Sequence, residues 1–364
     1  MLAEVVVVTM RCVVWAGLAI LMITGAGAAE AARKKAEPAE KNAKAEPVSR
    51  DAINAAAFPE GDKPAKTAKN KKPDPLMIKV QVLLDRARFS PGAIDGRDGE
   101  NLQGALSAFA VAQGLPATKT VTKEVFEKLQ ATSADPVASE YTITEEDVAG
   151  PFVEKMPAKM EEQAGLDAMG YTNAREMLAE RFHMARDLLV ALNPGKPLDK
   201  AGTVIVVAAV PPLETGKSKD KTKVEKNVAR IEVDKQTRQV RAFDKEGKLQ
   251  AFYPASIGSE EKPAPSGSAK VEGVALDPPY TYNPKYAFKG VKSKEKFTIK
   301  PGPNNPVGVV WIDLSIPSYG IHGTPEPEKV GKTESHGCIR LTNWDARDLA
   351  MKVERNAKVE FKDQ

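Results

Sequence analysis

A cysteine and two histidines gather in one short stretch near the C-terminus. The sequence reads His322-Gly323-Thr324 and then, after a charged loop, Ser335-His336-Gly337-Cys338-Ile339-Arg340. The whole chain holds three histidines and two cysteines, and the other cysteine, Cys12, lies in an apolar N-terminal segment. A lone cysteine accompanied by histidine is a candidate nucleophile, because an imidazole can take the thiol proton and return it.

Acyl transfer through a cysteine needs a thiolate, a base and hydrogen-bond donors for the oxyanion. Cys338 follows His322 by sixteen residues, too far for one helical turn, so a loop between adjacent strands has to bring them together. Gly337 lets the backbone approach a substrate closely. The residue types alone leave two alternatives open: a buried inert thiol, or a zinc site that combines His322, His336 and Cys338.

The motifs of the C-terminal part together resemble the YkuD-type L,D-transpeptidases. Beside the two segments already quoted, the matching motifs are Pro265-Ser266-Gly267, Asn283-Pro284-Lys285-Tyr286, Pro303-Asn304-Asn305-Pro306-Val307-Gly308 and Tyr319-Gly320. This resemblance covers about residues 225 to 362 and implies a mostly-β catalytic domain, whose bounds we place at 225–363.

The resemblance also implies roles for individual residues. Cys338 is expected to be the nucleophile, and His322 the proton donor and acceptor, oriented by a nearby backbone carbonyl for which Gly323 is the candidate. The residues expected to shape the oxyanion and substrate pocket are Ser335, His336, Gly337, Gly323 and Arg340. No metal or cofactor is implied. If His322 holds the catalytic proton, the rate should respond to pH near ~6.5, the ordinary value of an imidazole.

The reaction implied is attack of Cys338 on the bond between an L-centre and a D-centre in a peptidoglycan tetrapeptide stem. Terminal D-alanine leaves, and transfer of the acyl group to a second stem gives a 3→3 cross-link. Water as the acceptor would give an L,D-carboxypeptidase or endopeptidase, and a protein lysine would give a protein-to-peptidoglycan ligase. The alternative from another class is a non-catalytic cell-wall-binding protein. Carbapenem-type inhibitors are expected to acylate Cys338.

The elements that position these residues belong to a multidomain chain. In the C-terminal part, apolar residues alternate with period two, which predicts strands, and one helix is predicted from Trp344 to Glu354 with Thr342 or Asn343 as its cap. Trp311 and Tyr286 are interpreted as core aromatics rather than substrate platforms.

Two smaller modules precede this domain. Apolar residues with helical spacing predict a three-helix bundle at 75–131, with Thr122 as a cap, and this segment resembles a peptidoglycan-binding domain. Residues 140–211 predict a small α+β module with strands near 141–143 and 204–207, which resembles a degenerate LysM glycan-binding module. Its histidine, His183, is interpreted as structural.

The N-terminus is typical of an export signal. Arg11 precedes the apolar run 13–23, and small residues follow, so we predict a signal peptide at 1–29 that is cleaved near Ala28 or Ala29. Lys- and Ala-rich linkers are predicted at 30–74 and 212–224. The expected location is the periplasm or cell wall, and the formal charge of +4 gives no reason to expect nucleic acid as a partner.

Overall fold

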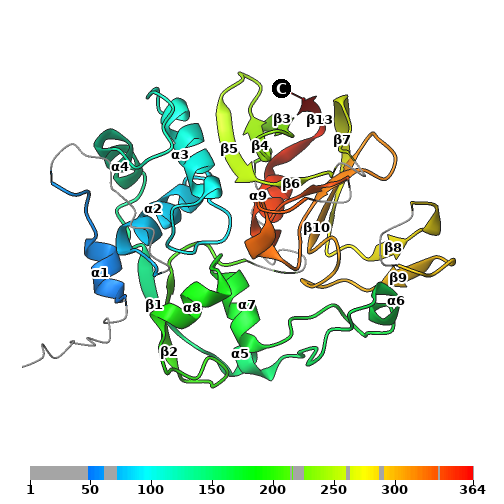
Figure 1. Cartoon of the computed structure of the whole chain (residues 1–364), viewed down its shortest axis with the longest axis horizontal. Coiled ribbons are helices and arrows are strands. Elements are labelled where there is room, and N and C mark those ends of the chain that lie inside the picture. The colour runs from blue at the N-terminus through cyan, green and yellow to red at the C-terminus, as the bar shows by residue number, and fades with distance from the viewer. Residues whose placement is uncertain are drawn as a thin grey trace, which may run out of the picture. The chain divides into compact units, whose positions relative to one another are not determined.

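The structure, a computed structural model, describes residues 48–60, 72–213, 215, 225–259, 263–286, 291–334 and 337–363. Residues 46–364 form one compact unit, in which helical modules pack beside a β-rich domain (Figure 1). The predicted signal peptide and nearly all of the predicted linker at 212–224 lie outside the described residues. None of the helices within the described ranges is long and apolar enough to cross a membrane.

The first module is a helical bundle, as the spacing of its apolar residues predicts. Its helices are α1 (Arg50–Ala55), α2 (Pro75–Arg86), α3 (Glu100–Ala112) and α4 (Lys123–Gln130). The side chains of Asp74 and Thr122 cap α2 and α4 by accepting hydrogen bonds from backbone N–H groups of the first turn. The linker prediction is wrong at 50–55, because α1 forms there and buries Ile53 completely against the bundle.

The second module is an α+β unit whose two strands lie near the predicted positions 141–143 and 204–207. Its elements are β1 (Ala138–Thr142), α5 (Glu145–Ala149), α6 (Met160–Gln163), α7 (Ala174–Arg181), α8 (Arg186–Leu192) and β2 (Val204–Ala208). Strands β1 and β2 pair in antiparallel fashion, and α7 and α8 lie between them in the chain. The resemblance of this fold to a glycan-binding LysM module stays a prediction.

The C-terminal domain is β-rich, as predicted. Its elements are β3 (Val228–Asp234), β4 (Gln239–Phe243), β5 (Leu249–Pro254), β6 (Ser256–Ile257), β7 (Gly267–Leu276), β8 (Tyr280–Tyr282), η1 (Pro284–Tyr286), β9 (Phe297–Ile299), β10 (Val310–Leu314), β11 (Gly320–His322), η2 (Pro327–Lys329), β12 (Ile339–Arg340), α9 (Asn343–Lys352) and β13 (Val353–Lys362). In the described part of the domain, the main sheet has the order β5-β4-β3-β13-β7-β10-β11-β12-β6, and β8 pairs with β9 in a separate hairpin. Thr342 caps α9, which ends two residues earlier than predicted.

The helical modules are packed directly onto the β-rich domain. Phe252 of β5 joins their hydrophobic core and exchanges backbone hydrogen bonds with Arg88 and Ser90. Arg88 Nε also donates to Asp348 Oδ2 of α9 at 2.9 Å. The ring of His183 stacks on the Trp344 ring of α9, with 5.0 Å between centroids. The first turns of α9, which adjoin the cysteine segment, are therefore covered by the N-terminal modules.

Candidate active site

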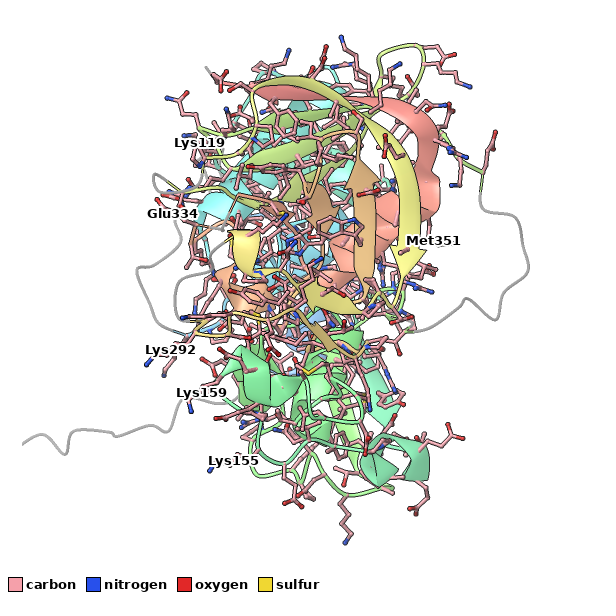
Figure 2. All side chains as sticks on the ribbon, turned by 90° about the vertical axis from the view of Figure 1, so that its right-hand side faces the viewer. Lys119, Lys155, Lys159, Lys292, Glu334 and Met351 are labelled. Atoms are coloured by element: carbon pink, nitrogen blue, oxygen red, sulfur yellow. The ribbon has the colours of Figure 1, made fainter. Side chains whose placement is uncertain are left out.

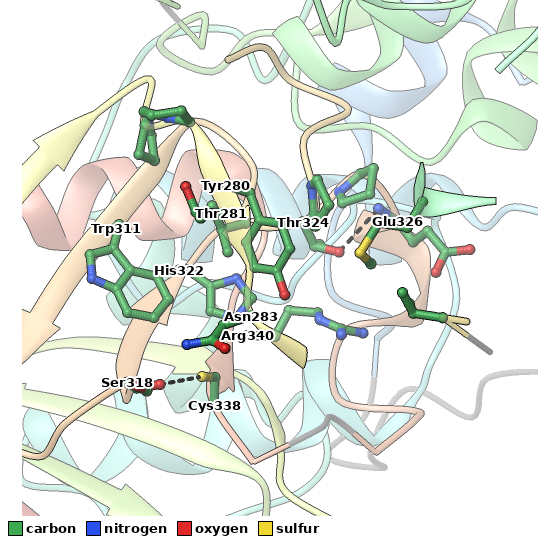
Figure 3. A pocket seen from close by; sticks show the side chains of 17 residues that line it. Tyr280, Thr281, Asn283, Trp311, Ser318, His322, Thr324, Glu326, Cys338 and Arg340 are labelled. Atoms are coloured by element: carbon green, nitrogen blue, oxygen red, sulfur yellow. Dashed lines mark hydrogen bonds between the residues drawn. The ribbon is translucent and has the colours of Figure 1, made fainter. Parts of the chain in front are cut away.

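Two parallel strands bring the predicted nucleophile and base together. β11 ends at His322, the chain turns through η2, and β12 then runs beside β11 in the same direction, with His322 in register with Arg340. Cys338 directly precedes β12 and lines the same pocket as His322 and Arg340 (Figure 3). The strand–loop–strand arrangement expected from the spacing of His322 and Cys338 is thus present.

Cys338 is a half-buried free thiol. Its Sγ lies 3.8 Å from the Ser318 carbonyl oxygen. Burial raises the pKa of the Cys338 thiol above its ordinary value, although the Gly320 backbone and the positive charge of Arg340 favour the thiolate. The predicted nucleophile is therefore a protonated thiol, which would need a base in order to react.

His322 is buried and neutral. Its Nδ1 lies 2.7 Å from the Gly323 carbonyl oxygen, and because a carbonyl only accepts, Nδ1 must carry the proton and leave Nε2 free. Burial and the charge of Arg340 lower the pKa of His322 from 6.5 to about 3, against the opposing effect of this hydrogen bond. With this lowered pKa, we no longer expect the rate to respond to pH near ~6.5. The Gly323 carbonyl thus lies where the family resemblance implies a group that orients the His322 ring.

Asn343, the first residue of α9, holds the loop that follows His322. Its Oδ1 accepts hydrogen bonds from Val309 N at 3.2 Å and from Thr324 N at 3.0 Å. A Cβ atom on Gly323 would overlap this oxygen, so the glycine next to the histidine is required by the close approach of Asn343. The start of α9 and the loop that follows His322 are therefore packed together through Asn343.

The pocket is a cavity of about 490 Å³ with a mixed lining. Trp311 of β10 stacks on His322 with 5.7 Å between ring centroids, so it forms a wall of the pocket; the interpretation of Trp311 as a core aromatic is corrected. Tyr280 and Thr281 of β8 also line the pocket, beside His322 in Figure 3. Arg340 contributes a guanidinium whose Nε is buried and has no hydrogen-bond partner among the residues that the structure describes.

A segment of the second module reaches this pocket. Between α5 and α7 the chain crosses to the β8–β9 hairpin, where Met160 of α6 joins the lining. Glu161 Oε1 accepts hydrogen bonds from the backbone N–H groups of Lys292 (2.8 Å) and Ser293 (3.0 Å). Figure 2 shows Lys159 and Lys292 at one edge of the molecule, where these two segments meet. We call residues 150–170 the strap.

The strap is also fixed at its other end. Met169 N donates to the Pro301 carbonyl at 3.0 Å, and Asn304 N donates to the Met169 carbonyl at 2.9 Å. Asn304 Nδ2 donates to the Gly170 carbonyl at 3.0 Å. The strap is thus bonded to the chain on both sides of β9, through Glu161 before this strand and through Met169 and Gly170 after it.

Other predicted site residues have different outcomes. Ser335 and His336 lie outside the described residues, as does the side chain of Tyr286. Gly337 has φ +109°, a conformation that glycine adopts most readily, directly before the nucleophile. In the described ranges no group of three residues with metal-ligating side chains lies close enough together to hold a metal ion. His183 is buried, with Nδ1 3.1 Å from Asp85, which fits the structural role predicted for it.

Sequence reasoning missed three contributors to the site. The sequence predicts Asn343 only as a helix cap. Its position five residues after Cys338 is the one sign that it lies near the site. Tyr280 lies three residues before the matched motif that begins at Asn283, and this proximity is its one local signal. Met160 carries no signal, because its module is remote in sequence and only the fold brings it to the pocket.

Comparison with known proteins identifies the β-rich domain. Residues 228–361 match the family model described as YkuD, L,D-transpeptidase catalytic domain. The chain is 45% identical over 60 residues to YkuD of Bacillus licheniformis, covering 16% of this chain and 36% of that protein. It is 30% identical over 132 residues to YqjB of Bacillus subtilis, covering 35% of this chain and 67% of YqjB. Both relatives carry the L,D-transpeptidase name.

Among solved structures, L,D-transpeptidase 3 from Mycobacterium tuberculosis is similar at 16% identity and a TM-score of 0.31. The similarity covers 44% of this chain and 67% of that one, and that enzyme has also been solved with a faropenem-derived adduct. The alignment with YkuD of B. licheniformis spans about a third of that relative's length. Through residues 228–361, this chain belongs to the L,D-transpeptidases, a family of cysteine-dependent enzymes.

Proposed function

We propose that this protein is a peptidoglycan L,D-transpeptidase that forms 3→3 cross-links through a Cys338 thioester. The observation that supports this most directly is the neutral His322, with Nε2 unprotonated, in the same pocket as the Cys338 thiol. A base in this protonation state can accept a thiol proton at neutral pH.

In the first half-reaction, Cys338 attacks the carbonyl between the third and fourth residues of a donor stem. The thiol proton passes to His322 Nε2, and the carbonyl oxygen becomes an oxyanion near the backbone N–H groups around Gly337 and Cys338. The C–N bond then breaks, D-alanine takes the proton from His322 and leaves, and the donor remains as a thioester on Cys338.

In the second half-reaction, the side-chain amine of another stem attacks the thioester. His322 accepts a proton from this amine and returns it to the sulfur as the C–S bond breaks. The product is a new amide between the third residues of two stems. Arg340 can hold a carboxylate of the substrate, because its buried Nε lacks a described protein partner while it lines the cavity.

The same thioester can be transferred to water or to a protein lysine, which gives the alternative hydrolase or ligase. Glu326 lines the same pocket as Arg340, and a carboxylate at this place favours an approaching cationic amine over neutral water.

We further propose that the protein acts in the periplasm or cell wall after removal of its signal peptide, and that its two N-terminal modules contact glycan strands. A non-catalytic wall-binding protein has no use for a paired base and thiol.

Incubation of the full chain with a disaccharide-tetrapeptide tests this function. We expect mass spectrometry to find a 3→3 dimer and one free D-alanine per cross-link, and neither with Cys338→Ala. A carbapenem should add to the wild-type protein at Cys338 and not to the variant. Free D-alanine without the dimer would identify a hydrolase, and dimer formation by Cys338→Ala would reject the cysteine mechanism.

A further inference from the structure

A buried carboxyl group of the second module points at the catalytic loop. Glu180, in the last turn of α7, is 3% exposed, although it belongs to a helix far from the cysteine motif in sequence. Asn343 Nδ2 donates a hydrogen bond to Glu180 Oε1 at 2.6 Å. The same amide nitrogen lies 3.2 Å from the Pro303 carbonyl oxygen.

These contacts determine which way the Asn343 amide faces. Its oxygen must lie toward Val309 N and Thr324 N, which can only donate. On the other side, the Pro303 carbonyl can only accept, and Glu180 Oε1 accepts as well. Rotation of the amide by half a turn would lose all of these hydrogen bonds. Buried groups left unpaired in this way are costly, so the amide is held in one orientation.

The orientation matters because it is transmitted to the base. Asn343 Oδ1 fixes Thr324 N, the peptide group between Gly323 and Thr324 also carries the Gly323 carbonyl, and that carbonyl accepts from His322 Nδ1. We propose that Glu180 is a positioning residue for catalysis, which fixes His322 through Asn343 and the 323–324 peptide. The second module would then be a functional part of the active site and not only a wall-binding attachment.

Glu180 acts here as a hydrogen-bond acceptor and not as a charge. The charged groups around it are Glu176 of the same helix, Arg186 of α8 and Glu328 of η2, and Tyr171 lies close by. Burial raises the pKa of Glu180 to about 8, although the Asn343 hydrogen bond opposes this. A protonated carboxyl keeps one oxygen that accepts, so a glutamine should replace it well, whereas a leucine of similar size should not.

The rate of Cys338 acylation by a carbapenem tests this role in the full chain. The proposed role of Glu180 rests on the proposed thiol–imidazole chemistry but not on the identity of the acyl acceptor. The acylation rate can therefore be interpreted even if the cross-linking assay fails. We expect Glu180→Leu to lower the saturating acylation rate about tenfold, the equivalent of one hydrogen bond, with little change in the half-saturating concentration. Glu180→Gln should stay within about threefold of wild type.

Asp147→Asn is the matched control. Asp147 pairs with Arg181 and Tyr141, and all of its hydrogen-bond partners among the described residues belong to the second module. It should lower the melting temperature without changing the acylation rate. Equal rates for Glu180→Leu and wild type, or equal losses in the leucine and glutamine variants, would overturn the proposal.

A second variant pair keeps the proposal falsifiable if Glu180→Leu fails to fold. Asn343→Asp removes the amide donor and brings two carboxyl groups together, so one of them should hold a proton that the two share. We expect acylation by this variant to fall increasingly below wild type as the pH rises above about 8 and that proton is lost. Adding Glu180→Gln returns a donor from the opposite side and should restore the rate severalfold. No recovery in this double variant would contradict a hydrogen-bonded contact between the two positions.

Discussion

At the scale of single residues, the site pairs a neutral thiol with a neutral imidazole. Burial disfavours the charged form of both Cys338 and His322, so it raises the first pKa and lowers the second. A preformed ion pair of thiolate and imidazolium does not fit these shifts. In the proposed mechanism, the proton therefore moves during attack on the substrate, and the acylation rate depends on general-base catalysis.

This predicts an unusual pH profile for acylation of Cys338. His322 is deprotonated above about pH 4, because its pKa is about 3. Burial raises the pKa of Cys338 above its ordinary value, so its thiol stays protonated at neutral pH. We expect the rate of carbapenem acylation to be flat from about pH 5 to 8 and to rise at higher pH as thiolate forms. Stopped-flow measurements across this range provide the check.

Variants separate His322 from other titrating groups in that experiment. His322→Gln should lower the rate by about 10²- to 10⁴-fold over the flat range, the usual contribution of a general base. His183→Gln controls for the other described histidine and should leave the profile flat. A break near pH 6.5 that disappears in His322→Gln would show that the imidazole has its ordinary pKa.

At the scale of elements, the strap makes the β8–β9 hairpin part of a larger structure. A two-stranded hairpin is marginally stable alone, and this one carries Tyr280 at the pocket. Glu161 bonds the loop at 292–293, and Met169 bonds the segment at 301–304. The strap therefore limits how far this side of the pocket can open.

Removal of the Glu161 carboxylate should loosen the hairpin. Glu161→Ala takes away the acceptor for Lys292 N and Ser293 N, so we expect faster hydrogen exchange at 291–299 and a severalfold higher half-saturating concentration of the tetrapeptide. Glu162→Ala is the matched control, since within the described ranges the Glu162 carboxylate pairs only with the exposed Lys159, three residues earlier. Equal exchange in the two variants would mean that the strap does not restrain the hairpin.

At the scale of the whole molecule, the sequence predicts elements better than the contacts between them. The period-two pattern and the spacing of His322 and Cys338 predict adjacent strands, because local alternation and a short loop carry that information. Glu180 and Asn343, by contrast, are far apart in sequence and each looks like an ordinary helical residue. Their contact depends on how α7 packs against α9, which no local pattern encodes.

The same distance in sequence explains the corrected expectations. Helix α1 falls in a segment of linker-like composition, and only the bundle surface that covers Ile53 makes it a helix. The pKa of His322 likewise depends on burial under Trp311 and on Arg340 from the next strand. Composition and motif predict which groups react, whereas tertiary packing determines their protonation.

Packing at this interface should also appear in the stability of the whole molecule. Burial raises the pKa of Glu180 from 4.5 to about 8, so the folded chain keeps a proton that the unfolded chain loses in this range. The stabilisation from this proton is complete below about pH 4.5 and is lost as the pH rises through 8, with a slope on the order of 1 kcal/mol per pH unit. We therefore expect the free energy of unfolding to fall between pH 5 and 8.

Glu180→Gln isolates that contribution. The glutamine does not titrate, so urea unfolding of this variant at pH 5, 6.5 and 8 should give a flatter curve than wild type and a higher stability at pH 8. The pKa of Asp147 shifts in the opposite direction. Burial opposes this shift, but hydrogen bonds from Thr144, Tyr141 and Arg181 lower the pKa. The contribution of Asp147 to the free energy of unfolding is therefore lost only as the pH falls. Asp147→Asn should accordingly keep the wild-type decline from pH 5 to 8. Parallel curves for Glu180→Gln and wild type would mean that Glu180 is already ionised in the folded chain at pH 5.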